Sequence, residues 1–148
     1  MEWTRGEDVV STDKSRLSLD FIHGFLKDAY WSKGRSRETV ELSIQNSLLC
    51  FGLYHHGLQA GFARVVTDLT THFWVCDVFV LEDHRGRGLG TWLMECVVST
   101  PELRGIRGIV ATRDAHGLYE KVGFRCPEDP RRLMWRLPDG VDHGRRTA

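Results

Sequence analysis

The sequence contains 148 residues, in which 20 lysines and arginines balance 20 aspartates and glutamates. This length suits one domain with a single hydrophobic core, and the balanced charge gives no overall attraction to nucleic acid or to an anionic membrane surface, so neither is expected as a partner. The first residues lack the apolar core of a secretion signal and no apolar run is long enough to span a bilayer, which together predict a cytoplasmic protein.

The first part of the chain predicts helices. Residues 1–16 are polar and are expected to form an N-terminal arm or an edge segment. Apolar residues then recur at three- or four-residue spacing over residues 19–29, which predicts an amphipathic helix that ends near Tyr30 and Trp31. A second, short helix is expected over residues 38–46.

Strands dominate the middle of the chain. Apolar segments predict three of them, over residues 48–54, 59–68 and 71–81, and His55-His56-Gly57 predicts a hairpin turn between the first two. After a glycine-rich loop the pattern predicts a helix, a strand, a second helix and a last strand, over residues 91–100, 107–112, 115–124 and 133–137. This order predicts an α+β fold, with a sheet flanked by helices. One domain is expected over residues 17–137, followed by a mobile tail over 138–148.

The glycine-rich loop follows the last of the three strands. Glycines at 86, 88 and 90 allow successive backbone N–H groups to point toward one anion, and the helix that follows adds the positive end of its dipole. The loop therefore predicts a phosphate or pyrophosphate site, with a purely structural turn as the alternative. It is not a P-loop, because no Gly-Lys-Ser or Gly-Lys-Thr follows, and Thr91 stands where a dinucleotide-binding fingerprint needs a third glycine.

Arg85, Gly88 and Gly90 form an Arg-x-x-Gly-x-Gly motif that resembles the pyrophosphate loop of the GNAT superfamily of N-acetyltransferases. Two other segments resemble the same superfamily. Asp77-Val-Phe-Val80 is similar to the strand that leads to the loop, and residues 115–124, which read AHGLYEKVGF, are similar to the last helix. The resemblance covers roughly the whole expected domain. It implies a GNAT-like mixed, mostly antiparallel sheet whose central strands splay apart, with pantetheine lying in the gap.

The resemblance also implies a reaction. Acetyl-CoA is the expected cosubstrate, and the amine of a small molecule or a peptide attacks its thioester directly. Thr112 stands at the position of a frequent Asn, so that contact to the pantetheine is lost or is made by a hydroxyl. The cofactor-binding residues that the resemblance implies are Val78, Phe79, Val80, Arg85, Gly86, Arg87, Gly88, Leu89, Gly90, Thr91 and Thr112.

Two residues are implied as catalytic. Tyr119 matches the tyrosine that lies beside the coenzyme sulfur in the superfamily, so it is the expected general acid, with simple packing as the alternative. Asp77 is the candidate base, although Cys76 stands where the polyamine acetyltransferases have a first acid. On a regular strand residues 76 and 77 face opposite sides, so Asp77 would not replace that acid and could instead bind a cationic acceptor, orient a water or complete a buried hydrogen-bond network. His72 and His116 are alternative bases.

The acceptor is expected to enter between the loop after the first helix and the end of the second expected strand, as in the superfamily. This implies substrate-binding roles for Tyr30, Trp31, Arg64, Thr67 and Asp68. The four cysteines are widely spaced, so they predict no metal site and are expected to be small buried hydrophobic residues.

Two other functions stay open. An acyl-CoA sensor or inactive homologue of the same fold would keep the loop without a competent base. An interaction protein would use the glycines only for a turn. Dimers are common in the superfamily, so a homodimer is possible, although no segment of the sequence marks an interface.

Overall fold

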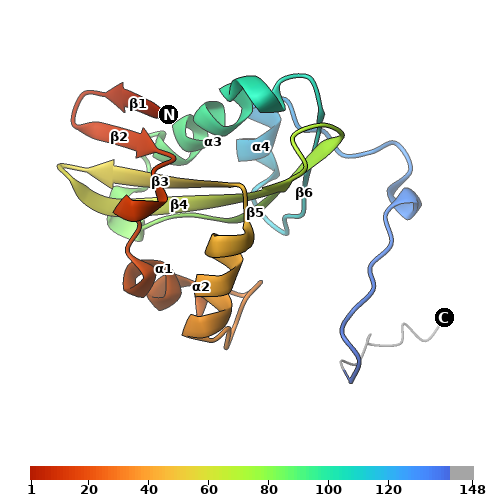
Figure 1. Ribbon diagram of the computed structural model, residues 1–148. Coiled ribbons are helices and arrows are strands. Elements are labelled where there is room, and N and C mark those ends of the chain that lie inside the picture. The colour runs from red at the N-terminus through yellow and green to blue at the C-terminus, as the bar shows by residue number, and fades with distance from the viewer. Residues whose placement is uncertain (141–148) are drawn as a thin grey trace.

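The computed structural model describes residues 1–140, which form a single sheet with helices on both of its faces. The strand order is β1-β2-β3-β4-β5-β6, and all neighbours are antiparallel except β5 and β6, which run parallel (Figure 1). The mixed, mostly antiparallel sheet of an α+β fold is therefore confirmed. The strands are β1 (Glu2–Arg5), β2 (Asp8–Ser11), β3 (Leu49–His55), β4 (Leu58–Thr67), β5 (His72–Val80) and β6 (Arg107–Val110).

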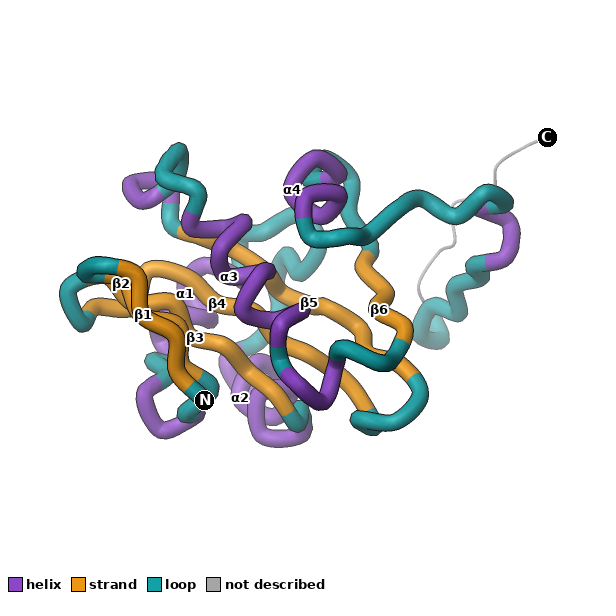
Figure 2. The backbone as a smooth tube through the Cα atoms, turned by 90° about the horizontal axis from the view of Figure 1, so that it is seen from above, coloured by secondary structure: helices purple, strands orange, loops and turns teal. Residues whose placement is uncertain are grey.

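Helices α3 and α4 cover one face of the sheet, and α1 and α2 cover the other (Figure 2). None of the helices within residues 1–140 is both long and apolar enough to cross a membrane. α1 ends earlier than expected because the chain turns after it, where the Gly34 N–H donates to the Lys27 carbonyl at 2.8 Å. Tyr30 and Trp31 therefore lie in a tight loop. The helices are α1 (Leu19–Leu26), α2 (Arg37–Asn46), α3 (Leu89–Ser99) and α4 (His116–Lys121).

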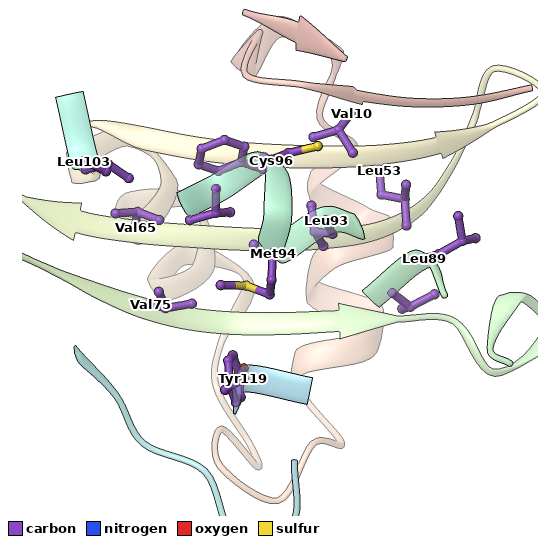
Figure 3. Close-up of a cluster of buried hydrophobic side chains, with 14 of the residues drawn as sticks. Val10, Leu53, Val65, Val75, Leu89, Leu93, Met94, Cys96, Leu103 and Tyr119 are labelled. Atoms are coloured by element: carbon purple, nitrogen blue, oxygen red, sulfur yellow. The ribbon is translucent and has the colours of Figure 1, made fainter. Parts of the chain in front are cut away.

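Two hydrophobic clusters form the core, one on each face of the sheet. The larger cluster joins the sheet to α3, and Tyr119 of α4 lies at its edge (Figure 3). In the smaller cluster, which lies between the sheet and helices α1 and α2, the ring of Phe25 stacks on Phe79 at a centroid distance of 3.9 Å. Because Phe79 lies on β5, this stacking fixes α1 against the strand that leads to the glycine-rich loop.

Residues 1–16, expected as an arm outside the domain, supply two strands of the sheet instead. β2 pairs with β3 along its whole length, and Val10 is fully buried in the larger cluster. The alternative expectation, an edge segment, is correct only for β1, which is an edge strand of the sheet. The apolar part of β2 is too short to show a periodic pattern in the sequence, which is why the sheet extends further than expected.

The strand expected over residues 133–137 is wrong. This segment follows a 3-10 turn at Pro130–Arg132 and runs away from the sheet as a loop (Figure 1). Met134 is 88% exposed, and β6 pairs with no described strand other than β5. This mostly apolar segment is therefore present without a neighbouring strand. Of the tail expected over 138–148, the part from residue 141 onward lies outside the described residues.

β5 and β6 separate about halfway along β5. Their pairing runs from His72 with Arg107 to Val75 with Val110. Beyond Val75, no strand of the described chain pairs with the β6 side of β5. This confirms the splayed central strands. It leaves backbone groups between residues 76 and 80 open on one side, apart from the Val80 carbonyl, which accepts from Arg85 Nε.

Gly61 of β4 lies too close to β5 to accept a side chain without a shift of the backbone. A Cβ there would lie 2.7 Å from the Phe79 carbonyl oxygen, whereas a Cβ at Gly24 of α1 would have no described atom within 4 Å. We expect Gly61→Ala to destabilise the protein by about 1–3 kcal/mol, because overpacking forces the two strands apart. Gly24→Ala, the matched control, should keep or raise the melting temperature because alanine favours a helix. Thermal unfolding of both variants checks this; an unchanged Gly61→Ala protein would contradict the close approach.

Candidate active site

The glycine-rich loop presents backbone donors at the end of β5. Gly86 and Gly88 have left-handed φ values of 75° and 73°, which explains the need for glycine at both positions. Gly88 is the N-cap of α3, and no side chain of the described chain caps the first N–H groups of this helix. Arg85 Nε donates to the Val80 carbonyl at 3.0 Å and so ties the loop to the strand. The free N–H groups and the helix dipole together form an anion site.

The N-terminal hairpin supports this loop. Arg87 Nη2 lies 3.6 Å from Asp8 Oδ2 on β2, and Arg5 on β1 donates to the Arg87 carbonyl at 3.5 Å. Gly90 serves packing, because a Cβ there would lie 3.0 Å from Leu118 Cδ1 of α4. Among the expected cofactor-binding residues, Gly90 thus brings α3 and α4 together, in addition to offering its N–H.

The strand residues expected to bind the coenzyme present their backbone, rather than their side chains, to the gap between β5 and β6. The Phe79 and Val80 side chains are buried in the two hydrophobic clusters, and Val78 is half-buried. Their open backbone groups lie on the side of β5 from which β6 has separated. An extended chain of amides can pair there as an added strand would.

A β-bulge interrupts β5 at Asp77. Phe62 of β4 pairs with Phe79 and Arg64 pairs with Cys76, so two residues of β5 stand opposite one residue of β4. Asp77 has a positive φ of 53°, which is uncommon for a residue other than glycine. The expectation that residues 76 and 77 face opposite sides is therefore wrong, because the bulge breaks the alternation and turns the Asp77 side chain toward Arg64, on the side where Cys76 lies.

Two guanidinium groups hold the Asp77 carboxylate. Arg35 Nη1 lies 2.9 Å from both carboxylate oxygens, and Arg64 Nε donates to Oδ2 at 2.8 Å. Trp31 Nε1 donates to Oδ1 at 3.3 Å. The Asp77 side chain is only 3% exposed, and each of its oxygens already accepts from two donors. Of the roles considered for Asp77, this geometry favours a buried hydrogen-bond network.

This network forms the floor of a cleft of about 290 Å³. The cleft opens between the loop after α1 and the gap between β5 and β6. The Tyr30 hydroxyl accepts from the Arg113 N–H at 3.3 Å, and this bond connects the two sides of the cleft. The structure thus brings together most of the expected catalytic and acceptor residues, namely Tyr30, Trp31, Arg64, Asp77, Thr112 and Tyr119.

Tyr119 lines the cleft with a protonated hydroxyl. Its burial raises the pKa to about 12, and the nearby Tyr30 and Cys76 add to this shift. Its ring packs against Phe124 at a centroid distance of 5.8 Å, so part of its role is structural. The hydroxyl donates to no residue within 1–140, and this leaves its proton available to a molecule in the cleft.

Cys76 also lines the cleft but is not activated as a nucleophile. Burial raises the pKa of its thiol, so the thiol stays protonated near neutral pH. Cys50 and Cys96 are buried, as expected, whereas Cys126 is exposed. No group of three or more His, Cys, Asp or Glu residues within 1–140 is arranged to hold a metal ion.

Four expected residues, Thr67, Asp68, His72 and His116, lie outside this cleft. Asp68 sits in the turn between β4 and β5, where its Oδ1 accepts the N–H groups of Thr70 and Thr71 at 2.9 and 2.8 Å. These hydrogen bonds, with that from the Thr71 backbone first, lower the pKa of Asp68. These contacts give Asp68 a turn-forming role. Together with Thr67 and His72 it lines a second cavity beside Trp74 and Cys76, so its substrate role stays a prediction. His72 and His116 are both exposed, and neither lines the cleft.

Thr112 lies in the cleft just before α4, where its Oγ1 accepts the Ala115 N–H at 3.0 Å. Several further cleft residues were not anticipated from the sequence, among them Arg35, Trp74, Asp114 and Trp135. A lone aspartate in an otherwise apolar strand predicts a positively charged partner in the core. It does not identify which arginine forms the ion pair. The place of Trp74 in the cleft can be explained by strand alternation, because residues two apart on a strand lie on the same face and Trp74 stands two residues before Cys76.

Comparison with known families gives one match. A family model described as an acetyltransferase (GNAT) domain matches residues 46–126, which include β3 to β6, the glycine-rich loop and α4. A protein of Gibberella zeae that is named as a candidate acetyltransferase is 32% identical in an alignment 142 positions long, and the match covers 80% of this chain and 79% of that protein.

Solved structures show the same fold. A candidate acetyltransferase of the GNAT family from Xanthomonas campestris pv. campestris has a TM-score of 0.85 at 43% identity, with 93% of this chain and 98% of that chain covered. A GNAT family acetyltransferase from Elizabethkingia anophelis, whose structure contains acetyl-CoA, has a TM-score of 0.64 at 15% identity, with 84% and 80% of the two chains covered. The second likeness extends to the fold alone.

Replacing Asp77 by asparagine keeps the size of the side chain but leaves two guanidinium groups without their carboxylate. Removing one partner of a buried ion pair costs about 3–5 kcal/mol, so we expect Asp77→Asn to lower the melting temperature strongly. Asp20→Asn is the matched control, because Asp20 pairs with Arg37 on the exposed surface and such pairs contribute little. Equal melting temperatures for the parent and Asp77→Asn would contradict the structural role of the network.

Proposed function

The chain belongs to the GNAT family of acetyltransferases, and on that basis we propose that it transfers the acetyl group of acetyl-CoA to a primary amine of a small molecule or a peptide. One observation carries this proposal. The anion site of the glycine-rich loop, the open side of β5 and the cleft with the Tyr119 hydroxyl follow one another along the same strand.

The residues present fit acetyl-CoA. The uncapped N–H groups at the start of α3 suit its pyrophosphate, and Gly86 and Gly88 keep the approach to them free of side chains. The open backbone of Val78 to Val80 suits the pantetheine amides. When bound, the coenzyme supplies the acetyl group as a thioester. We assign the polarisation of the thioester carbonyl to an open backbone N–H of β5 beside the cleft.

The amine must lose a proton before it attacks, and the cleft favours its neutral form. Arg35 and Arg64 surround a single carboxylate, so the floor of the cleft keeps an excess positive charge. A nearby positive charge disfavours the ammonium form of an entering amine and lowers its pKa. The acceptor therefore releases its proton to water more readily than in solution, and Asp77 does not need to act as the base.

Tyr119 holds the proton for the departing thiolate. The pKa of about 12 keeps its hydroxyl protonated throughout the neutral range. Since a thiol has a pKa of about 8.5, the phenol stabilises the nascent thiolate by a hydrogen bond more than by complete proton transfer. Any fall in rate between pH 6 and about pH 9 should therefore come from groups other than Tyr119.

An acyl-CoA sensor of the same fold is the second candidate. It is favoured by one observation, that within residues 1–140 no histidine lines the cleft and the Asp77 carboxylate is fully engaged. Such a protein would bind the coenzyme without turning it over.

Release of free thiol from acetyl-CoA decides between the two functions. Polyamines, aminoglycosides, amino acids and peptide N-termini serve as acceptors. Amine-dependent release of thiol, with acetylated product found by mass spectrometry, is the expected result. Tight coenzyme binding without release for any acceptor would favour the sensor and contradict the proposed transfer.

Gly88→Val should weaken the binding of acetyl-CoA. A valine there would have to adopt a φ of 73°, which its branched side chain disfavours, and it would project into the open space above the helix N-terminus. We expect the Kd measured by calorimetry to rise by about tenfold or more, because hydrogen bonds to a charged group are lost. Gly105→Val is the control, because a Cβ at Gly105 meets no described atom within 4 Å and Gly105 lies outside the loop. Undiminished affinity in Gly88→Val would contradict the assignment of the loop.

Tyr119→Phe removes the proton and keeps the ring. We expect kcat to fall by roughly 10²–10⁴-fold, the usual contribution of a general acid, while the Kd for acetyl-CoA changes little. Packing against Phe124 is retained, so the melting temperature serves as the check on folding. Unchanged turnover, with chemistry shown to limit the rate, would assign Tyr119 to packing alone.

A further inference from the structure

The charged residues of the acceptor cleft leave it with an excess positive charge. Among residues 1–140, those that line it are Arg35, Arg64, Asp77 and Asp114. Asp114 is paired with Arg113 at 3.3 Å, and both are largely exposed, so their charges cancel at the mouth. At the floor, two guanidinium groups share one carboxylate. An acceptor that brings several positive charges is repelled here, whereas one that brings an anion is attracted.

Part of the hydrogen-bonding capacity of these two arginines is unused. Arg35 binds Asp77 through Nη1 alone, and its Nε and Nη2 donate to no residue within the described chain. Arg64 uses Nε for Asp77 and Nη1 for Ser47 Oγ at 3.2 Å, which leaves its Nη2 without a described partner. Their side chains are 22% and 14% exposed. Planar, partly buried guanidinium donors of this kind recognise a carboxylate.

The walls of the cleft are aromatic. The rings of Tyr30 and Trp31 pack edge to face, with their centroids 5.1 Å apart. The centroids of the Trp74 and Trp135 rings are 5.6 Å apart. All four rings line the cleft. A cleft of about 290 Å³ is at the small end of the range for ligand pockets, so it suits one ring rather than a polymer.

From these three observations we infer that the acceptor is an aromatic amino carboxylate, a small molecule that carries its amine beside a carboxylate and an aromatic side chain. The carboxylate binds the free donors of Arg35 and Arg64, the ring lies between the aromatic walls, and the amine is left facing the gap between β5 and β6. The inference rests on the proposed acetyl transfer and specifies its substrate.

A panel of related amines tests this directly, with thiol release from acetyl-CoA as the readout. Tryptophan is compared with tryptamine, which lacks the carboxylate, and with tryptophanamide, which replaces it by a neutral group. Spermidine provides a polycation, and a tryptophanyl dipeptide moves the carboxylate away from the amine. We expect kcat/KM for tryptophan to exceed that for each of the others by about tenfold or more, the effect of one charge-assisted interaction.

The outcomes separate the two proposals. Preference for tryptamine, tryptophanamide, spermidine or the dipeptide overturns the amino carboxylate and leaves the acetyl transfer standing. If none of these acceptors releases thiol, the amino carboxylate is overturned, and the wider acceptor panel described above decides whether the acetyl transfer itself stands. Equal rates for tryptophan and tryptamine also overturn the inference, because the carboxylate then has no partner in the cleft.

Variants of Arg35 test the same interaction in the protein. Arg35→Gln should reduce the ratio of kcat/KM for tryptophan to that for tryptamine by about tenfold, and Arg35→Lys, which keeps the charge but loses the planar donors, should reduce it less. The ratio is measured because loss of folded protein affects both substrates equally. Arg37→Gln is the control, since Arg37 pairs with Asp20 on the exposed surface and should keep the parent ratio. An unchanged ratio in Arg35→Gln would overturn the role of Arg35 in acceptor binding.

Discussion

Three donors from separate parts of the chain meet on the carboxylate of Asp77: Arg35 and Trp31 from the loop after α1, and Arg64 from β4. They hold a non-glycine residue at a positive φ in the middle of a strand, a conformation that costs of order 1–3 kcal/mol and persists only where surrounding contacts impose it. Because Arg35 and Trp31 bind the Asp77 carboxylate, the bulge holds the loop after α1 against the sheet. One wall of the acceptor cleft is therefore positioned by the same ion pairs that form its floor.

The bulge also accounts for the shape of the coenzyme side. A β-bulge bends its strand and increases the local twist. The pairing of β5 with β6 ends at Val75, two residues before Asp77, and the open stretch of β5 then leads into the glycine-rich loop. Where the two strands have separated, β5 presents backbone groups to the gap, and Tyr119 of α4 lines the cleft beside it. Under the proposed function, coenzyme and acceptor meet at the place where the strand is irregular.

The sequence predicted those parts of the molecule that local chemistry determines. The glycines at 86 and 88 are needed wherever the chain turns with positive φ, and the apolar segments of β3, β4 and β5 must be buried. It did not predict β2, whose few apolar residues show no period, nor the loop at residues 133–137, where the pattern is right but no partner strand is present. The direction of Asp77 and its pairing with Arg35 depend on tertiary structure, because a bulge cannot be read from strand alternation.

The central claim is that the coenzyme binds in the gap between β5 and β6, with its sulfur in the cleft whose floor is formed by Asp77 and its partners. A crystal structure of the protein with coenzyme A bound tests it most directly. The account predicts the pyrophosphate on the N–H groups at the start of α3, the pantetheine along residues 76–80, and the sulfur beside the Tyr119 hydroxyl. Coenzyme bound elsewhere, or with its sulfur directed away from the cleft that Arg35, Arg64 and Asp77 form, would contradict it.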